Sequence, residues 1–183
     1  STVTEFLRQQ DYKVIDADQV VHELQEPGGQ LYQALLSAFG PAILQEDGRL
    51  DRPKLGAMIF GNPQLLGQSS QIQNQIIREE LASRRDLLAE TEAVFFMDIP
   101  LLFELSYENW FDQIWLVDVT EETQLSRLMN RNALSQEEAE KRITAQLSPN
   151  EKRNRVNLII DNNGLQEATY QQLRDAIQKL ERR

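Results

Sequence analysis

The chain has 183 residues, of which 40% are hydrophobic and 26% charged, and its formal net charge is -10. This length suits one domain, or one domain with a sizeable insertion, and the absence of cysteine excludes disulfides and thiolate metal sites. The acidic balance opposes general binding to nucleic acid, and no apolar run approaches the ~20 residues of a membrane span, so we expect a cytoplasmic protein.

Residues 1–10 predict an amphipathic helix, and residues 13–16 predict a short strand with a helix after it. Asp16 and Asp18 lie two residues apart where this strand ends. Such a pair of carboxylates can hold a metal ion or accept the proton of a hydroxyl group. Asp18 is equally a suitable N-cap for the helix that follows, and the local pattern favours that interpretation.

Residues 19–92 are predicted to be almost wholly helical, with a hairpin-like turn signal at Asp47-Gly48. This stretch lies between two predicted strands and is far longer than a crossover connection needs. We therefore expect a helical insertion that binds a substrate. His22 is the single histidine of the chain, so a histidine-based triad or zinc site is not available.

The stretch at residues 93–104 organises the rest of the chain. Its first five residues, Ala93–Met97, are apolar and predict a strand covered on both faces, as in a parallel α/β sheet. Asp98 follows at the carboxyl end, where open parallel sheets bind their ligands. Asp98 is therefore a candidate for organising a metal ion in phosphoryl transfer. The pattern alone slightly favours a simpler interpretation, a buried strand that ends in a solvated turn.

Residues 113–117 and 157–160 predict two further apolar strands, which end at Asp118 and Asp161. A helix follows each of them. Four strands that alternate with helices predict a parallel α/β sheet with helices on both faces. Composition and spacing lead no further than this fold class.

The one concentration of basic residues lies around two capping boxes, at residues 135–138 and 148–151. These charges can pair with neighbouring glutamates, as Lys141 can with Glu137 one turn away. Alternatively, they belong to a mobile cover whose arginines stabilise a phosphoryl group during transfer. The basic residues are Arg127, Arg131, Lys141, Arg142, Lys152, Arg153 and Arg155.

Short motifs along essentially the whole chain resemble those of dephospho-coenzyme A kinases. Each motif is weak alone, but Asp-Ala-Asp, Pro-Leu-Leu-Phe-Glu and Asp-Asn-Asn-Gly together are fairly specific. The resemblance implies transfer of the γ-phosphoryl group of ATP to the ribose 3′-hydroxyl of dephospho-coenzyme A, the last step of coenzyme A biosynthesis. The motifs are Ile15–Asp18, Leu50–Arg52 with Ile59-Phe60 and Asn62-Pro63, Ile99–Glu104, Thr123–Arg127 with Arg131, and Asp161–Gly164.

The same resemblance implies an α/β architecture with a three-layer parallel sheet of the P-loop kinase type, a helical substrate-binding insertion and a helical lid. Residues 1–18, 93–130 and 156–183 would form the nucleotide-binding core. Residues 19–92 would form the domain for the acceptor substrate, and residues 131–155 the lid.

The resemblance implies catalytic and metal-binding roles for five residues. Asp18 would accept the proton of the 3′-hydroxyl group, and Asp16 would support it or the metal shell, although which of the two is the base stays open. Ser1 and Asp98 would bind Mg²⁺. Arg131 would close onto the phosphates with the lid.

Binding roles follow from the resemblance as well. Thr2 would lie with Ser1 at the phosphates of ATP, and Asn162 and Asn163 would lie beside its adenine. The expected ligands are therefore ATP, Mg²⁺ and dephospho-coenzyme A, and no pattern in the sequence indicates an oligomeric state. The residues that would shape the acceptor side of the cleft are Ile99, Pro100, Leu101, Leu102 and Glu104.

Two departures from the family pattern stand out. Asn74-Gln75 replace a His-Pro pair that the family usually carries, so one substrate contact is expected to differ. The glycines and lysine of the Walker A motif G-x-x-x-x-G-K-[ST] are absent, and the chain starts at Ser1-Thr2 as if cut after that lysine. We therefore expect a strand and phosphate-binding loop to be missing, and the chain as printed to be unstable and inactive alone.

Two other functions stay open at this point. One is another nucleotide or nucleoside kinase with the same fold. The other is a non-catalytic nucleotide-binding relative without the phosphate-binding loop.

Overall fold

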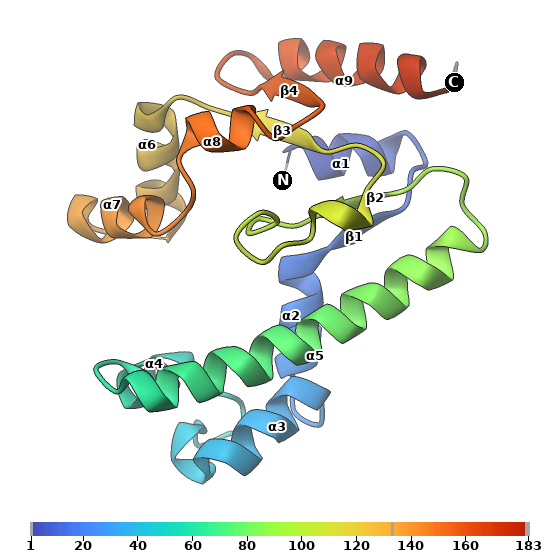
Figure 1. Ribbon diagram of the computed structural model, residues 1–183. Coiled ribbons are helices and arrows are strands. Elements are labelled where there is room, and N and C mark those ends of the chain that lie inside the picture. The colour runs from blue at the N-terminus through green and yellow to red at the C-terminus, as the bar shows by residue number, and fades with distance from the viewer. Residues whose placement is uncertain (1, 133, 182–183) are drawn as a thin grey trace. The chain divides into compact units, whose positions relative to one another are not determined.

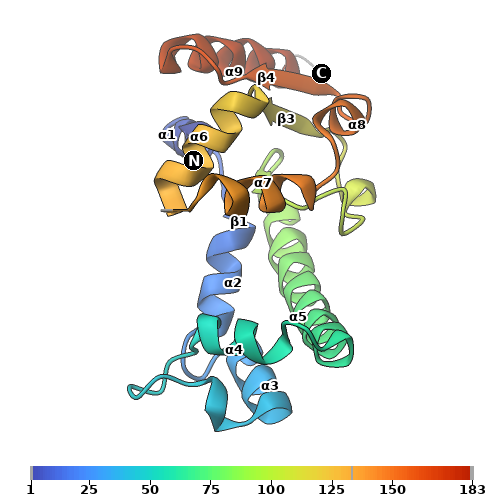
Figure 2. The same ribbon diagram turned by 90° about the vertical axis from the view of Figure 1, so that its left-hand side faces the viewer.

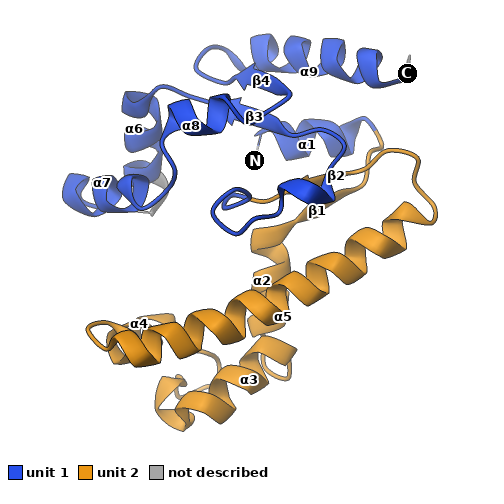
Figure 3. Cartoon of the chain, viewed as in Figure 1, with its two compact units in different colours: residues 1–10, 100–183 blue, residues 11–99 orange. Residues whose placement is uncertain are grey.

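Parallel strands and helices build two compact units (Figure 3). The computed structural model describes residues 2–132 and 134–181, and of residues 131 and 132 only the backbone. One unit consists of residues 11–99, and the other of residues 1–10 together with residues 100–183. The sequence placed the boundaries elsewhere, on either side of residues 19–92, and the functional domains remain predictions.

In the contiguous unit, residues 11–99, two short strands pair in parallel. They are β1 (Val14–Asp16) and β2 (Phe96–Asp98), and their register places Asp16 opposite Asp98. The chain between them is helical apart from its turns, as the sequence predicts (Figure 1). Its helices are α2 (Ala17–Gln25), α3 (Gln30–Phe39), the short 3₁₀ helix η1 (Pro41–Ile43), α4 (Arg52–Ile59) and α5 (Pro63–Ala89).

Strand β2 is shorter and less covered than the sequence predicts. The expected start at Ala93 is wrong, because Ala93 and Val94 lie in a bend and the strand begins at Phe96. All three residues of β2 have ladder partners on β1, which starts at Val14, and this ladder does not extend back to Ala93. Its side chains are half-buried, so the expectation of full cover on both faces is also wrong.

The long helix α5 begins where its sequence signals predict. The Asn62 side chain accepts hydrogen bonds from the amides of Gln64 and Leu65 at 3.1 and 3.2 Å, and Pro63 occupies the first turn, where no amide donor is needed. Helices α2, α3 and α4 all contact α5 (Figure 2). Leu31, Leu35, Ile43 and Leu81 form the best buried part of this core.

The second unit also contains one parallel strand pair, β3 (Trp115–Asp118) with β4 (Leu158–Asp161). Helix α9 packs on β4 and α8 on β3, yet Val117 and Ile159 are 40% and 43% exposed. These strands too are less covered than their apolar sequence predicts. The helices of this unit are α1 (Thr2–Gln9), η2 (Glu108–Trp110), α6 (Glu121–Asn132), α7 (Gln136–Thr144), α8 (Pro149–Arg153) and α9 (Gln166–Glu181).

The predicted terminal helices pack together within this unit. Val3, Phe6 and Leu7 of α1 are buried, and the ring of Phe6 lies 4.5 Å from that of Tyr170 on α9. The α/β class with parallel strands is confirmed, with ladder hydrogen bonds that join β1 to β2 and β3 to β4. Among the described residues, no helix combines the length and apolar character that crossing a bilayer demands.

Candidate functional site

Three of the predicted acidic residues gather at the carboxyl end of the β1–β2 pair. Asp16 and Asp98 are the last residues of their strands and stand directly opposite each other in the ladder. Asp18 lies two residues beyond Asp16, in the first turn of α2. Like charges placed opposite each other in a sheet repel, which favours a cation between them.

The helix N-cap is Asp16, and the sequence-based preference for Asp18 in that position is wrong. The Asp16 Oδ1 atom accepts a hydrogen bond from the Gln19 amide at 3.1 Å, because α2 starts at Ala17, directly after the strand. Asp18 is exposed, and within the described part of the chain its carboxylate has no hydrogen-bond or ion-pair partner. Its carboxylate is therefore available for chemistry.

The chemistry of these donors suits Mg²⁺. Magnesium in phosphoryl-transfer sites takes one or two carboxylates and completes its octahedron with phosphate oxygens and water. Asp16 and Asp98 supply such a pair from two adjacent strands. The described residues contain no cluster of three or more His, Cys, Asp or Glu side chains suited to a metal, so a site built wholly from protein ligands is not indicated.

The other strand pair ends in a turn that is held by hydrogen bonds. Asp118 and Asp161 are opposite each other at the ends of β3 and β4. Asn163 Oδ1 accepts from the Thr120 amide at 2.7 Å, and Asn163 Nδ2 donates to Asp161 Oδ1 at 2.7 Å. The Asn163 backbone amide also donates to Asp161 Oδ1 at 2.9 Å, and this bond, followed by the one from the Asn163 side chain, holds the pKa of Asp161 below its usual value.

The neighbouring Asn162 is fixed as well. Its backbone amide donates to Asp118 O at 2.9 Å, its carbonyl oxygen accepts from Arg127 Nη2 at 3.0 Å, and the buried Thr169 hydroxyl lies 3.2 Å from its Oδ1 atom. Thr120 was predicted to cap the helix after β3, and its Oγ1 atom does accept from the Thr123 amide at 3.3 Å, whereas no role was predicted for Thr169. A polar residue within the apolar face of the last predicted helix was the available signal for Thr169.

Replacing Asn163 with alanine should lower the free energy of unfolding by about 1–2 kcal/mol, because the Thr120 amide and the Asp161 carboxylate both lose a partner. Thermal denaturation measures this loss. Asn74→Ala is the matched control: Asn74 is exposed on α5, so the same substitution there should be neutral or slightly stabilising. Equal melting temperatures for the two variants would contradict the role given to Asn163.

The basic stretch pairs with other elements more than the sequence suggests. Lys141 does pair with Glu137 at 2.7 Å, as predicted, and both capping boxes are present. Arg153, however, binds the Asp118 carboxylate at 2.8 Å, and Lys152 binds Glu104 at 3.0 Å. The part of this stretch around α8 is thus tied to β3 and to the turn near residue 104.

The predicted acceptor-side residues follow β2. Ile99 is half-buried, and Pro100 and Leu101 are exposed. Leu102 and Glu104 are half-buried within the turn at residues 100–106. Burial would raise the pKa of Glu104, but the hydrogen bond from the Leu147 amide and the nearby Lys152 ammonium outweigh it and hold this pKa below its usual range.

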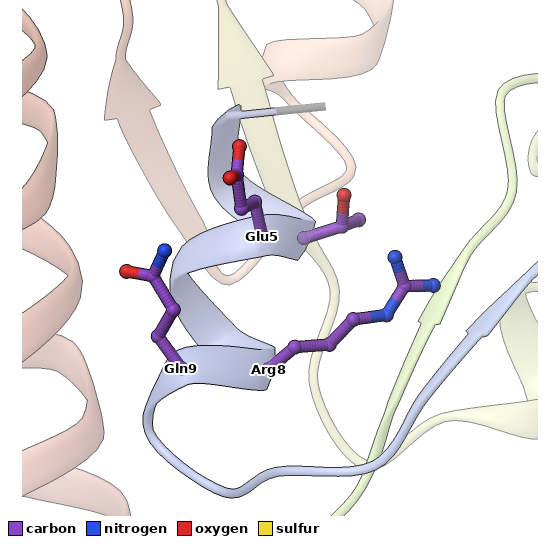
Figure 4. Close-up of a pocket in the computed structure, with 4 residues that line it drawn as sticks. Glu5, Arg8 and Gln9 are labelled. Atoms are coloured by element: carbon purple, nitrogen blue, oxygen red, sulfur yellow. The ribbon is translucent and has the colours of Figure 1, made fainter.

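The three remaining predicted residues lie at or beyond the edge of what the structure describes. Ser1 lies outside the described residues, and Thr2 is the first residue of α1. Arg131 belongs to the last turn of α6, but its side chain also lies outside the described part. A hollow of about 500 Å³ is lined by Thr4, Glu5, Arg8 and Gln9, which project from α1 (Figure 4). None of these four is a predicted site residue.

Known proteins resemble the chain over nearly its whole length. A dephospho-CoA kinase of Streptococcus pyogenes is 56% identical over 180 residues, covering 98% of this chain and 91% of the relative. One of Streptococcus agalactiae is 57% identical, covering 98% of this chain and 92% of the relative. A crystal structure from Thermus thermophilus has 30% identity and a TM-score of 0.79, covering 98% of this chain and 90% of its own. The dephospho-CoA kinase from Campylobacter jejuni has 26% identity and a TM-score of 0.73, with the same coverage.

Fold, site and these likenesses together define a phosphotransferase of the α/β kinase class, with acidic strand ends and a basic helical segment. The family model for dephospho-CoA kinase matches residues 1–167. The chain belongs to the dephospho-CoA kinase family. This confirms the resemblance that the short motifs carried.

Proposed function

We propose that the chain phosphorylates the ribose 3′-hydroxyl of dephospho-coenzyme A with ATP, as the last step of coenzyme A biosynthesis in the cytoplasm. The observation that carries the proposal is the family match over residues 1–167, together with relatives named dephospho-CoA kinase that are 56% identical over nearly the whole chain. The carboxylates at the ends of β1 and β2 are of the type that binds Mg²⁺ and accepts a hydroxyl proton in such a reaction.

The proposed base is Asp18. A general base must approach the hydroxyl proton to hydrogen-bond distance, and a carboxylate that already caps a helix has one oxygen engaged. Asp16 is engaged in this way, because its Oδ1 atom binds the Gln19 amide, whereas Asp18 is exposed. Asp18 would take the 3′-hydroxyl proton as that oxygen attacks the γ-phosphorus and the bond to the leaving ADP breaks.

Mg²⁺ would be held by Asp98 and Asp16 with the Ser1 hydroxyl, and when bound it would neutralise charge on the phosphates. Thr2 begins α1, and the amino terminus of a helix favours phosphate. Arg131 would meet the transferring group when the lid, residues 131–155, closes and excludes water.

The turn at Asn162 and Asn163 would lie beside adenine. The hydrogen bonds of these two side chains to Thr120, Asp161 and Thr169 support this proposal, since they keep the turn rigid before nucleotide arrives. Ile99, Pro100, Leu101 and Leu102 would border the acceptor, whereas Glu104, predicted from the sequence to lie with them, binds the Leu147 amide and Lys152. Residues 19–92 would hold the adenylate and pantetheine portions of the acceptor.

A panel of acceptors tests the reaction. The intact enzyme, which here means the protein with the expected strand and phosphate-binding loop before Ser1, is incubated with ATP, Mg²⁺ and either dephospho-coenzyme A, adenosine, AMP or coenzyme A itself. The products are identified by mass spectrometry. We expect kcat/KM for dephospho-coenzyme A to exceed that for the nucleoside and nucleotide by at least about 100-fold. Coenzyme A already carries the 3′-phosphate and should accept no phosphoryl group.

Other outcomes select other functions. Comparable transfer to adenosine or AMP would favour a general nucleoside or nucleotide kinase. Binding of ATP without transfer to any acceptor would favour the non-catalytic relative.

A further inference from the structure

The Glu104 carboxylate joins two segments that are distant in the sequence. Its Oε1 atom accepts a hydrogen bond from the Leu147 amide at 2.9 Å and lies 3.0 Å from Lys152 Nζ. The side chains of Lys152 and Glu104 are only 13% and 17% exposed, so water screens this ion pair weakly. Lys152 Nζ also donates to Gln146 Oε1 at 3.2 Å, which adds a third residue of the same segment to the cluster.

A second set of contacts holds the same two segments together. The Arg155 guanidinium lies 4.5 Å from the centre of the Phe103 ring and pairs with Glu108. Phe103 is buried, so this stacking contact is partly desolvated. Residues 147–155 are thus attached to residues 103–108 at both of their ends.

Helix α7, just before this attachment, is different. Among the described residues, the hydrogen bonds and ion pairs of its side chains stay within residues 135–144, for example Lys141 with Glu137 and Gln136 with Glu140. Its attachment to α6 is made by packing, with Ala139 fully buried. Residues 147–155 are therefore held mainly by charged groups, whereas α7 is held by apolar packing.

The turn that carries Glu104 is itself rigid. The Leu105 amide binds Leu101 O at 3.0 Å, and the Tyr107 amide binds Leu102 O at 2.9 Å. Tyr107 is 2% exposed, and its ring packs edge-on against Trp110 at 4.8 Å. A carboxylate on such a turn can hold a second segment in one position.

We propose that Glu104 is a positioning residue that fixes the trailing end of the lid, residues 146–155, on the turn at residues 100–107. The proposal rests on the lid function proposed above and gives that lid an immobile base about which α7 closes. Glu104 Oε2 is buried and accepts no hydrogen bond within the described structure, so the carboxylate makes both of its described contacts through Oε1. The negative charge at this position is matched by the Lys152 ammonium group, which a neutral amide would not attract as strongly.

Three substitutions separate the parts of this anchor. Glu104→Ala removes both contacts. Glu104→Gln can keep the acceptor for the Leu147 amide while it loses the charge that Lys152 needs, and Lys152→Met removes the ion pair alone. Glu137→Gln is the matched control, because it breaks an exposed ion pair on the lid that touches no other element.

Two measurements are made on each intact variant. Hydrogen exchange at the Leu147 amide, followed by NMR without substrate, reports the anchor directly. We expect about tenfold faster exchange in Glu104→Ala, and little change in Glu104→Gln or in the control. Steady-state kinetics should show kcat reduced about 10- to 100-fold in Glu104→Ala, since a small misplacement of a catalytic group has effects of this size. KM for dephospho-coenzyme A should stay within about threefold of the parent value, because the substitution removes no contact that binds the substrate in its ground state.

Either of two results would overturn the anchor. The first is a Leu147 amide that exchanges its hydrogen as slowly in Glu104→Ala as in the parent. The second is lost protection with unchanged kcat, which would mean that the position of the lid base does not matter. An inactive parent would instead refute the proposed function, and the exchange measurement, which needs no substrate, would still decide whether Glu104 fixes residue 147.

Discussion

Replacing Arg131 with alanine is expected to lower turnover by roughly 10³-fold or more while the melting temperature changes little. An arginine that meets the transferring phosphoryl group only in the closed complex contributes to the transition state and not to the resting fold. Its position in the last turn of α6, as the first residue of the proposed lid, suits such a role. Steady-state kinetics with ATP and dephospho-coenzyme A, together with thermal denaturation, measure both quantities.

Arg127 is the internal control for that experiment. It lies one turn earlier on α6 and donates to Asn162 O at 3.0 Å. Arg127→Ala should therefore reduce stability more than Arg131→Ala does and reduce turnover much less. Arg131→Lys adds a test of geometry, since lysine keeps the charge but loses the planar fork that binds two phosphate oxygens. Near-normal turnover in Arg131→Ala would return this residue to an ordinary solvated helix face.

The second large effect is expected for Asp18→Asn. Removing a general base typically lowers turnover by ~10²–10⁴-fold, and Asn has nearly the shape of Asp. Asp18 is exposed and does not cap α2, so the melting temperature should stay the same. Kinetics at saturating substrate and a thermal scan on the same preparation provide both values.

Asp16 supplies the comparison, because it does cap the helix. Asp16→Asn should keep most of the stability, since Asn caps about as well as Asp, whereas Asp16→Ala should cost about 1 kcal/mol. If turnover by Asp18→Asn lies within a few-fold of the parent, Asp18 is not the base. Asp16 would then be the next candidate for the base, and a large rate loss in Asp16→Asn that a raised Mg²⁺ concentration does not restore would support it.

The sequence predicts the ends of the strands better than their lengths. Asp16, Asp98 and Asp161 each close an apolar run, and each proves to be the last residue of a strand. The starts are less certain, because an apolar residue such as Val94 joins a strand only where a neighbouring backbone offers hydrogen bonds. That neighbour comes from a distant part of the chain and leaves no local signal.

The candidate site shows the same division between local and distant information. Capping boxes at Ser135 and Ser148 are local patterns, and both form as predicted. Glu104, in contrast, binds Leu147 and Lys152, which lie more than forty positions away in the sequence. The sequence contains several glutamates that could pair with Lys152, and only the tertiary structure shows that its partner is Glu104.

The ribosome delivers the two compact units at different times. Residues 11–99 are contiguous, so this unit has all of its own elements as soon as residue 99 has emerged. The other unit needs α1 to meet α9, where Phe6 packs on Tyr170. Domains fold as units during synthesis, and contacts between distant residues form late. Helix α1, whose apolar face packs on α9, therefore cannot complete its packing until α9 has been synthesised.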